Sequence, residues 1–204
     1  MSKLLCLIGV MGSGKDYRAK QFIKDSETFG YSMVHVNFAD ELREMMWDLL
    51  NWKPKNDEEY EYFKKGSIVD LGYAERLFDP YVYSISLTGR QLLQRMGTEV
   101  IRKRDPYFFV NQWKNKVDSL LCENKNVVCS DLRFINELKA AFNVAGNTKT
   151  KKEFIFCNYI SDRYDATNTH ESEQLAQRIL SDNYKDGELI DISYLLSLVS
   201  KNKG

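Results

Sequence analysis

The sequence predicts an α/β fold in three layers, a five-stranded parallel sheet with helices on both of its faces. Three observations support this prediction. Short apolar runs of strand length alternate along the chain with segments of helical periodicity. The first apolar run ends in a glycine-rich loop that opens a helix. The connections between runs are also long enough for the helical crossovers that parallel strands need.

Each element is placed by its own pattern. Apolar or alternating runs predict strands at residues 3–9, 32–38, 126–130, 152–160 and 188–192. Helical periodicity predicts helices at residues 14–29, 40–50 and 134–144, another from about residue 171, and an amphipathic helical tail. No repeat and no linker rich in glycine and proline interrupts this order. We therefore expect one domain over residues 1–204.

An inserted lobe is predicted at about residues 41–125, because the connection after the second strand is far longer than one crossover requires. Helical patterns inside it cover residues 56–65 and 87–96. A further helix is expected to open at Asp105-Pro106, since Asp suits the N-cap and Pro suits the first helical position. We expect this lobe to hold a second substrate, and we expect a lid region at about residues 161–170.

Composition excludes several classes of function. The chain has 29 basic and 29 acidic residues and a net charge of zero, so it carries no electrostatic footprint for nucleic acid or anionic lipid. No apolar run is long enough to span a bilayer, and the N-terminus lacks the apolar stretch of a signal peptide. The four cysteines show no C-x-x-C spacing, and three fall in predicted strands. These features are typical of a reduced cytoplasmic protein.

A phosphate-binding loop is predicted between the first strand and the first helix. Gly9, Gly14 and Lys15 have the G-x4-G-K spacing of loops that bind nucleoside triphosphates. In such loops, backbone N–H groups and the helix N-terminus face phosphate oxygens, and the lysine reaches the β- and γ-phosphates. The residues predicted to bind ATP are Gly9, Val10, Met11, Gly12, Ser13, Gly14, Lys15 and Asp16. The alternative is a glycine-rich turn without a ligand.

Asp16 occupies the position after Lys15, where Ser or Thr usually contacts the magnesium ion. A carboxylate among phosphates is repulsive unless a divalent cation lies between them, and magnesium prefers oxygen ligands. We therefore predict that Asp16 contacts Mg²⁺, through a water molecule. The alternative is that Asp16 only supplies favourable negative charge to the first turn of the helix.

Further candidates follow the ends of other predicted strands, because ligands of open parallel sheets bind at the carboxyl ends of the strands. Asp131 ends a strand and is a candidate second metal ligand, while Arg133 is a candidate for pairing with phosphate oxygens. Asp131 could instead cap the following helix. Asp40 and Arg43, in "NFADELR" after the second strand, lie at the same predicted edge.

The inserted lobe and the lid supply the remaining candidates. Arg90 and Gln94 are four residues apart and share a helix face, where Gln94 could contact a base or solvent. The pair Gly97-Thr98 is expected to interrupt that helix and to offer a new helical N-terminus to an anion. Arg163, in the predicted lid, is a candidate to close over the transferring phosphates.

These segments together resemble the deoxynucleoside monophosphate kinase family of bacteriophages. The motifs that carry the resemblance are "GVMGSGKD" (9–16), "FADELRE" (38–44), "TGRQLLQRMGTE" (88–99), Trp113, "DLRFINE" (131–137) and "HESE" (170–173). They cover about half of the chain. Tyr17 departs from the small hydroxyl residue expected after the aspartate, and residues 51–85 do not align.

The resemblance implies a P-loop kinase fold, ATP and Mg²⁺ as cofactors, a location in the host cytoplasm and a homodimer. It implies that a deoxynucleoside monophosphate is held by Arg90, Gly97, Thr98, Trp113, Asp131, Arg133 and Glu137. Such an acceptor has a phosphate pKa of about 6, so it is already anionic at neutral pH and needs no general base. Transfer then needs positive charge and alignment, which Lys15, Arg133 and Arg163 would supply.

Three alternatives remain open at this point. A kinase of the dephospho-coenzyme A or shikimate type would need a carboxylate base for its acceptor hydroxyl, and Asp40 is the candidate. Phosphomevalonate kinases also carry a Gly-Lys-Asp loop and use a phosphate acceptor. A nucleotide-binding switch would bind ATP without an acceptor, although the arginine-bearing lobe argues against it.

Overall fold

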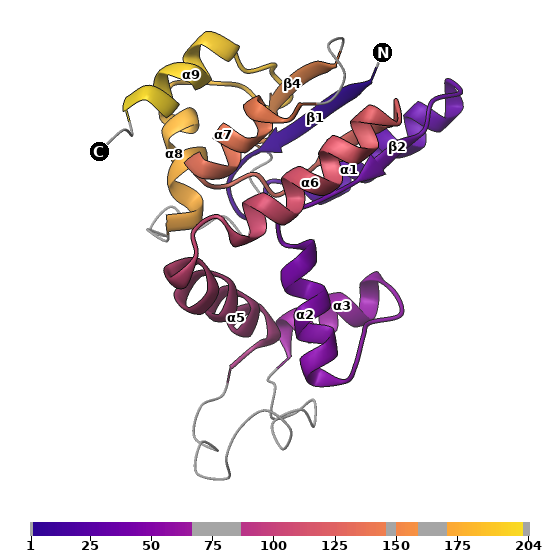
Figure 1. The fold of residues 1–204 in the computed structure, drawn as a ribbon. Coiled ribbons are helices and arrows are strands. Elements are labelled where there is room, and N and C mark those ends of the chain that lie inside the picture. The colour runs from indigo at the N-terminus through magenta and orange to yellow at the C-terminus, as the bar shows by residue number, and fades with distance from the viewer. Residues whose placement is uncertain (1, 67–86, 146–149, 159–170, 202–204) are drawn as a thin grey trace. The chain divides into compact units, whose positions relative to one another are not determined.

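The computed structural model describes residues 2–66, 87–145, 150–158 and 171–201 of the 204-residue chain. Residue contacts divide the chain into two compact units (Figure 1). Unit 1 comprises residues up to Phe38 and from Val110 onward, and unit 2 comprises Ala39–Phe109. No helix in the described ranges has both the length and the apolar character needed to cross a membrane.

Unit 1 is built on a parallel sheet of strand order β2-β3-β1-β4. The strands are β1 (Lys3–Ile8), β2 (Met33–His35), β3 (Asn126–Cys129) and β4 (Lys151–Phe156). The predicted parallel α/β sheet is therefore confirmed. β1, β2 and β3 are shorter than predicted by one to four residues, whereas β4 begins one residue earlier than predicted and ends at Phe156. The predicted end of that strand, at residues 159–160, lies outside the described residues.

The predicted fifth strand at residues 188–192 is wrong for the part of the chain that the structure describes, where the sheet has four strands. Only Leu189 makes a bridge to Ile155 of β4, and the pairing is antiparallel. The tight turn at Gly187, with φ of 81°, reverses the chain alongside β4. The Asp191 side chain then accepts the Ser193 N–H at 2.6 Å, and helix α9 begins immediately. The segment ends before a ladder can form.

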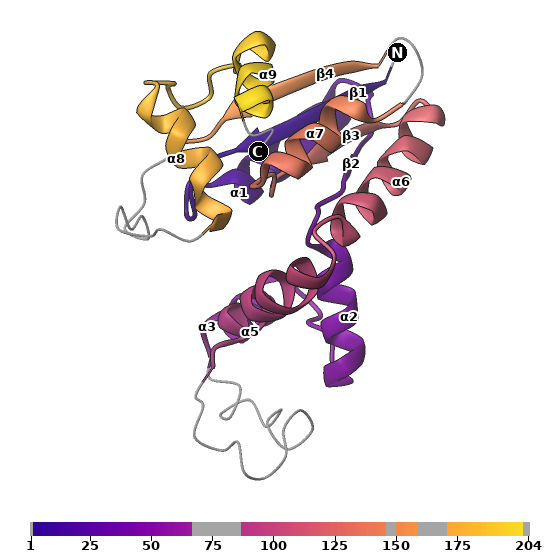
Figure 2. The ribbon, with the colours of Figure 1, turned by 60° about the vertical axis from the view of Figure 1, so that its left-hand side comes forward.

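Helices cover both faces of this sheet. On one face, Leu5 and Leu7 of β1 pack with Ala19 of helix α1 (Lys15–Thr28). On the other face, alternate β1 residues share a core with four later helices, and Figure 2 shows α7 and α9 over this face. These helices are α6 (Phe108–Cys122), α7 (Ile135–Asn143), α8 (Gln174–Ser181) and α9 (Ile192–Lys201). A short 3₁₀ turn, Glu171–Glu173, precedes α8. Alternate β1 side chains enter the two cores, so residues 4–8 are all buried once helices cover both faces.

Unit 2 is helical and has its own apolar core. Within its described residues, the helices are α2 (Asp40–Leu50), α3 (Asp57–Lys65), α5 (Gly89–Gln94) and the π-helix η2 (Arg95–Arg102). Trp47 and Phe63 meet edge to face at its centre, with ring centroids 5.1 Å apart. The Asn56 side chain accepts the Glu59 N–H at 2.9 Å and caps α3. The helices predicted at residues 40–50, 56–65 and 87–96 are thus confirmed as α2, α3 and α5.

Two details of the predicted lobe are wrong. Gly97 and Thr98 do not interrupt the helix, because η2 continues α5 directly. A Cβ atom at Gly97 would lie 2.7 Å from a methyl of Leu42, so the glycine permits close packing on α2 and creates no new N-terminus. Asp105 does accept the Tyr107 N–H at 2.9 Å, as a cap would, but α6 begins only at Phe108.

The loop after β1 depends on a close backbone contact at Gly9. A Cβ atom there would lie 2.1 Å from the Cys157 carbonyl oxygen and 2.5 Å from Ser13 Oγ. Gly12 and Gly14 then adopt φ values of 83° and 75°, in the left-handed region that favours glycine. The glycine pattern read from the sequence therefore has a steric basis at each of these positions.

Replacing Gly9 with alanine should destabilise the protein by about 2 kcal/mol or more, since a backbone carbonyl has little room to move. Chemical denaturation measures this loss. Gly30→Ala is the control, because its φ is 77° but nothing lies within 4 Å of its Cβ position, so it should cost only about 1 kcal/mol of conformational strain. Equal losses in the two variants would contradict the close contact.

Candidate functional site

Lys15 lies at the start of α1 and folds back over the loop that precedes it. Its ammonium donates to the carbonyl oxygens of Gly9 at 2.6 Å and Val10 at 2.7 Å, and to Ser13 Oγ at 3.2 Å. The side chain is buried, with 6% of the residue exposed. These neutral oxygens satisfy the hydrogen-bond donors of the ammonium but do not neutralise its charge.

The surroundings of Lys15 favour loss of its proton. Its pKa is lowered from the ordinary 10.5 to about 8, first by burial and then by the nearby Arg133 guanidinium. The carboxylates of Glu173 and Asp16 act in the opposite direction. A ligand with further negative charge would raise the pKa of Lys15 again, so the site is suited to an anion.

Glu173 already places an anionic group against this loop. The residue is 3% exposed, and its Oε2 accepts the Met11 backbone N–H at 2.6 Å. Its Oε1 accepts from Arg133 Nη1 at 2.9 Å. One carboxylate thus bridges a loop amide and a guanidinium, which is the pair of donors that a phosphate oxygen would use. We interpret the Glu173 carboxylate as occupying the place of an anionic ligand. Its contacts with the Met11 N–H and Arg133 support an anion-binding role for the loop.

Glu173 is not among the site residues predicted from the sequence, although it lies in the motif "HESE" (170–173). A carboxylate in the 3₁₀ turn before α8 gives no signal of its own burial. The structure buries Glu173 and leaves Glu171 exposed, a difference that the spacing within "HESE" does not predict.

Glu137 is a buried residue in the first turn of α7. It is 1% exposed, and its Oε2 accepts the backbone N–H groups of Arg133 at 2.7 Å and Phe134 at 3.1 Å. The carboxylate therefore satisfies donors at the N-terminus of α7. Its role in the described structure is to fix the backbone that carries Arg133.

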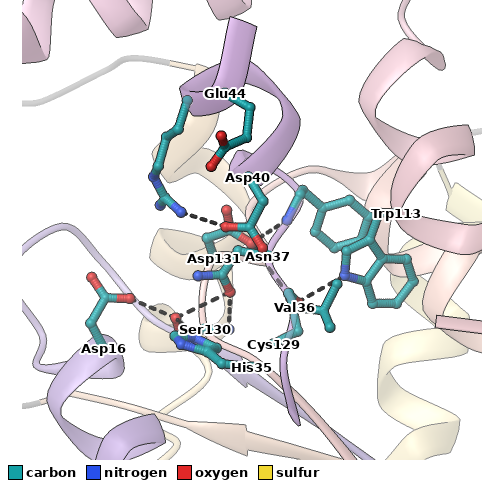
Figure 3. A network of polar contacts seen from close by, with 12 residues as sticks. Asp16, His35, Val36, Asn37, Asp40, Glu44, Trp113, Cys129, Ser130 and Asp131 are labelled. Atoms are coloured by element: carbon teal, nitrogen blue, oxygen red, sulfur yellow. Dashed lines mark hydrogen bonds and ion pairs between the residues drawn. The ribbon is translucent and has the colours of Figure 1, made fainter. Parts of the chain in front are cut away.

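Trp113 is also a core residue. It is 2% exposed, it stacks on Phe38 with ring centroids 4.2 Å apart, and its Nε1 donates to the Val36 carbonyl at 3.0 Å (Figure 3). Asp131 Oδ1 accepts the Phe38 N–H at 2.8 Å. Both residues thereby support the chain that leaves β2, and the indole presents almost no surface to a ligand.

Asp16 belongs to a polar network at the carboxyl ends of β2 and β3. Figure 3 shows Asp16 and His35 converging on Ser130. The Ser130 hydroxyl donates to Asp16 Oδ1 at 2.5 Å, and His35 Nε2 lies 2.9 Å from the same hydroxyl. Asn37 Oδ1 accepts the Ser130 N–H at 2.8 Å. His35 is therefore a member of this network.

The described side chains would hold a divalent cation only together with ligands from another molecule, such as substrate phosphates. Among the residues that the structure describes, no group of three or more His, Cys, Asp or Glu side chains could hold a metal ion. Asp16 offers a carboxylate at the start of α1, beside the loop, whereas Asp131 Oδ1 is engaged by Phe38. Magnesium is commonly held by one or two carboxylates together with substrate phosphates, so Asp16 fits such a site.

The remaining described candidates lie on the helices of unit 2. Arg43 pairs with Asp40 at 2.6 Å and donates through Nε to the Tyr60 hydroxyl at 3.0 Å. Arg90 is half-buried and Gln94 is exposed, one helical turn apart on α5. Thr98 is half-buried in η2 and Gly97 is buried. Arg163 and the predicted lid at residues 161–170 lie outside the described residues.

The four cysteines are free, and three of them are buried. Burial raises the pKa of Cys157 to about 11, although Arg18 and Lys15 nearby oppose the shift. The Cys157 thiol beside the loop is therefore uncharged near neutral pH and is no nucleophile.

Comparisons with known proteins give no family for this chain. No family model matches it, and no curated protein matches it. Among solved structures, it is similar to a chain from a structure of the Pnkp1/Rnl/Hen1 RNA repair complex, with 17% sequence identity and a TM-score of 0.38. That match covers 98% of this chain but 44% of the other, so this chain spans less than half the length of that protein. The site is therefore interpreted from its own geometry.

Glu173→Gln should bind inorganic tripolyphosphate roughly fivefold more tightly than the wild type. The substitution removes the negative charge of Glu173, which competes with the ligand for the Met11 N–H and the Arg133 guanidinium. Calorimetric titration measures the change. Glu171→Gln, an exposed residue of the same turn, is the matched control and should bind like the wild type. Weaker binding by Glu173→Gln would contradict this interpretation of Glu173 and indicate that the carboxylate positions Arg133 for the ligand.

Proposed function

We propose that this chain is a P-loop kinase that transfers the γ-phosphate of ATP to a deoxynucleoside 5′-monophosphate, giving ADP and the diphosphate. The single observation that carries the proposal is the anion cradle after β1. There a buried lysine, a loop N–H and an arginine converge, with an internal carboxylate between the last two.

The donor nucleotide is assigned to the loop. Backbone N–H groups of residues 9–16 and the N-terminus of α1 would receive the phosphates. Lys15 would leave the carbonyls of Gly9 and Val10 for the β- and γ-phosphate oxygens, which neutralise its charge as those carbonyls do not. Arg133 would exchange the Glu173 carboxylate for a transferring phosphate oxygen, where its planar donors stabilise developing charge.

The metal is assigned to Asp16. A bound Mg²⁺ would neutralise charge on the β- and γ-phosphates. The residue of this chain that would hold it is Asp16, whose position at the first turn of α1 puts a carboxylate beside the phosphates. Asp131, the other residue expected from the sequence, is proposed to support the site through its contact with Phe38.

The acceptor is assigned to an arginine and polar residues of the inserted lobe. A monophosphate acceptor is a dianion near neutral pH, so binding it needs cations and transfer needs no general base. Arg90 is proposed to bind its phosphate, and Gln94 and Thr98 its nucleoside, while Arg43 stays paired with Asp40. Arg163 is proposed to close over the transferring group, as lid arginines do.

The ion pair between Asp40 and Arg43 bears on the rival kinases. A kinase acting on a hydroxyl needs a carboxylate base within hydrogen-bond reach of that hydroxyl. Asp40 is instead held by Arg43 at 2.6 Å, and this pair would have to open before Asp40 could accept a proton. The observation favours a phosphate acceptor.

The test is ADP release from ATP and Mg²⁺ with a panel of acceptors. The panel comprises the deoxynucleoside and ribonucleoside monophosphates, phosphomevalonate, dephospho-coenzyme A, shikimate and no acceptor. We expect turnover with deoxynucleoside monophosphates and a loss of at least about a hundredfold in Lys15→Met. Lys24→Met, an exposed lysine of the same helix, is the control. Turnover only with an alcohol would contradict the proposed acceptor, and ATP binding without any turnover would indicate a switch.

Nucleotide affinity should fall as pH rises through the pKa of Lys15, which is about 8. Phosphates raise that pKa in the complex, so above this value the complex retains a proton that the free protein has lost. ATP should therefore bind about tenfold more weakly at about pH 9 than at about pH 7. Lys15→Arg, whose guanidinium stays charged, should lack this decline. A wild-type affinity that does not fall over this range would contradict the assignment of Lys15 to the phosphates.

A further inference from the structure

The contact between Asp16 and Ser130 reverses a general arrangement of phosphate-binding loops. In such proteins, a Ser or Thr after the loop lysine and an Asp at the end of a neighbouring strand together hold magnesium. Here the residue after Lys15 is Asp16, and the residue after β3 that faces it is Ser130. Ser130 Oγ and Asp16 Oδ1 lie 2.5 Å apart. A hydroxyl and a carboxylate are therefore again in contact, but the carboxylate follows the lysine and the hydroxyl follows the strand.

Asp131 does not restore the usual arrangement. Ser130 and Asp131 lie just beyond the end of β3, and their side chains have different partners. Ser130 faces Asp16, whereas Asp131 Oδ1 accepts the Phe38 N–H at 2.8 Å. The partner of Asp16 at the strand end is therefore the hydroxyl.

The proton of the Ser130 hydroxyl has a defined direction. The hydroxyl has one proton and two acceptors within reach, Asp16 Oδ1 at 2.5 Å and Asn37 Oδ1 at 3.2 Å, and the shorter contact to the charged carboxylate takes the proton. His35 Nε2, 2.9 Å from the same oxygen, must then carry a hydrogen and donate to it. Asn37 accepts the Ser130 backbone N–H at 2.8 Å. Ser130 is 1% exposed and held from several sides, so it can orient Asp16 rigidly.

We propose that Ser130 is a positioning residue that orients the metal-contacting carboxylate of Asp16. Relative to the general arrangement of phosphate-binding loops, the acid and the hydroxyl have exchanged places between the start of α1 and the end of β3. This inference rests on the proposed function and deepens it. Asp16 is the group that contacts a hard divalent cation carried by nucleotide phosphates, and Ser130, supported by His35, sets the orientation of its carboxylate. Outer-shell partners of this kind change metal affinity by about 10- to 100-fold.

The test measures how much a metal strengthens nucleotide binding. A non-hydrolysable ATP analogue is titrated calorimetrically with Mg²⁺ and again with EDTA, and the ratio of affinities is the metal increment. Ser130→Ala should lower the increment about tenfold and leave the affinity in EDTA unchanged. Asp16→Ser should nearly abolish the increment. The double variant Asp16→Ser/Ser130→Asp, which restores the usual arrangement, should recover most of it.

Two further measurements separate positioning from folding. Ser2→Ala is the matched control, because Ser2 is also buried and its hydroxyl bonds a side chain, Thr150, at 2.8 Å. It should keep the full increment. Electron paramagnetic resonance of Mn²⁺ with the analogue should show a changed coordination spectrum in Ser130→Ala but not in Ser2→Ala.

The outcomes distinguish this inference from the proposed function. A wild type that binds the analogue equally with Mg²⁺ and with EDTA overturns the inference and leaves the nucleotide site standing. A full increment in Ser130→Ala, or no recovery in the double variant, also overturns it. A wild type that binds no analogue under either condition overturns the proposed function and the inference with it.

Discussion

The parallel pairing of β1 with a strand on each side is the constraint on which the site depends. Because β3 and β4 both hydrogen-bond to β1, the chain leaves all three strands at one edge of the sheet. Gly9 then contacts the Cys157 carbonyl after β4, and Ser130 after β3 reaches Asp16. Segments far apart in sequence thus meet around one loop, and only glycine at position 9 allows the backbones to approach so closely.

Charge is the second organising feature of the site. Lys15 is held by neutral carbonyl oxygens, and Arg133 is held by the Glu173 carboxylate. Each arrangement satisfies hydrogen bonds, but the lowered pKa of Lys15 shows that its positive charge is poorly compensated. A multiply charged anion that replaces these partners would gain both cations at once, while Glu173 would have to withdraw. Until such an anion binds, the internal contacts satisfy the hydrogen-bonding groups of the site.

Local patterns predicted much of this fold, because period and glycine spacing are local properties. They identified the loop, α1 and the helices of unit 2, with ends in error by a few residues. Burial and pairing are not local, and the failures follow from that. Trp113 and Glu137 carry chemistry that suits a ligand, yet tertiary contacts place both in the interior. No spacing rule distinguishes Ser130 from Asp131, because the side that each faces depends on where β3 ends. Gly97 reads as a helix breaker until the Leu42 side chain above it is known.

The most direct test is a crystal structure of the protein with Mg²⁺ and a non-hydrolysable ATP analogue. We predict that the β-phosphate lies on the loop N–H groups and that the Lys15 ammonium has moved from the Gly9 and Val10 carbonyls to phosphate oxygens. We also predict that Glu173 has left Met11. A nucleotide bound elsewhere, or a loop nucleotide with Lys15 still on those carbonyls, would contradict the claim that this loop is the site of phosphoryl transfer.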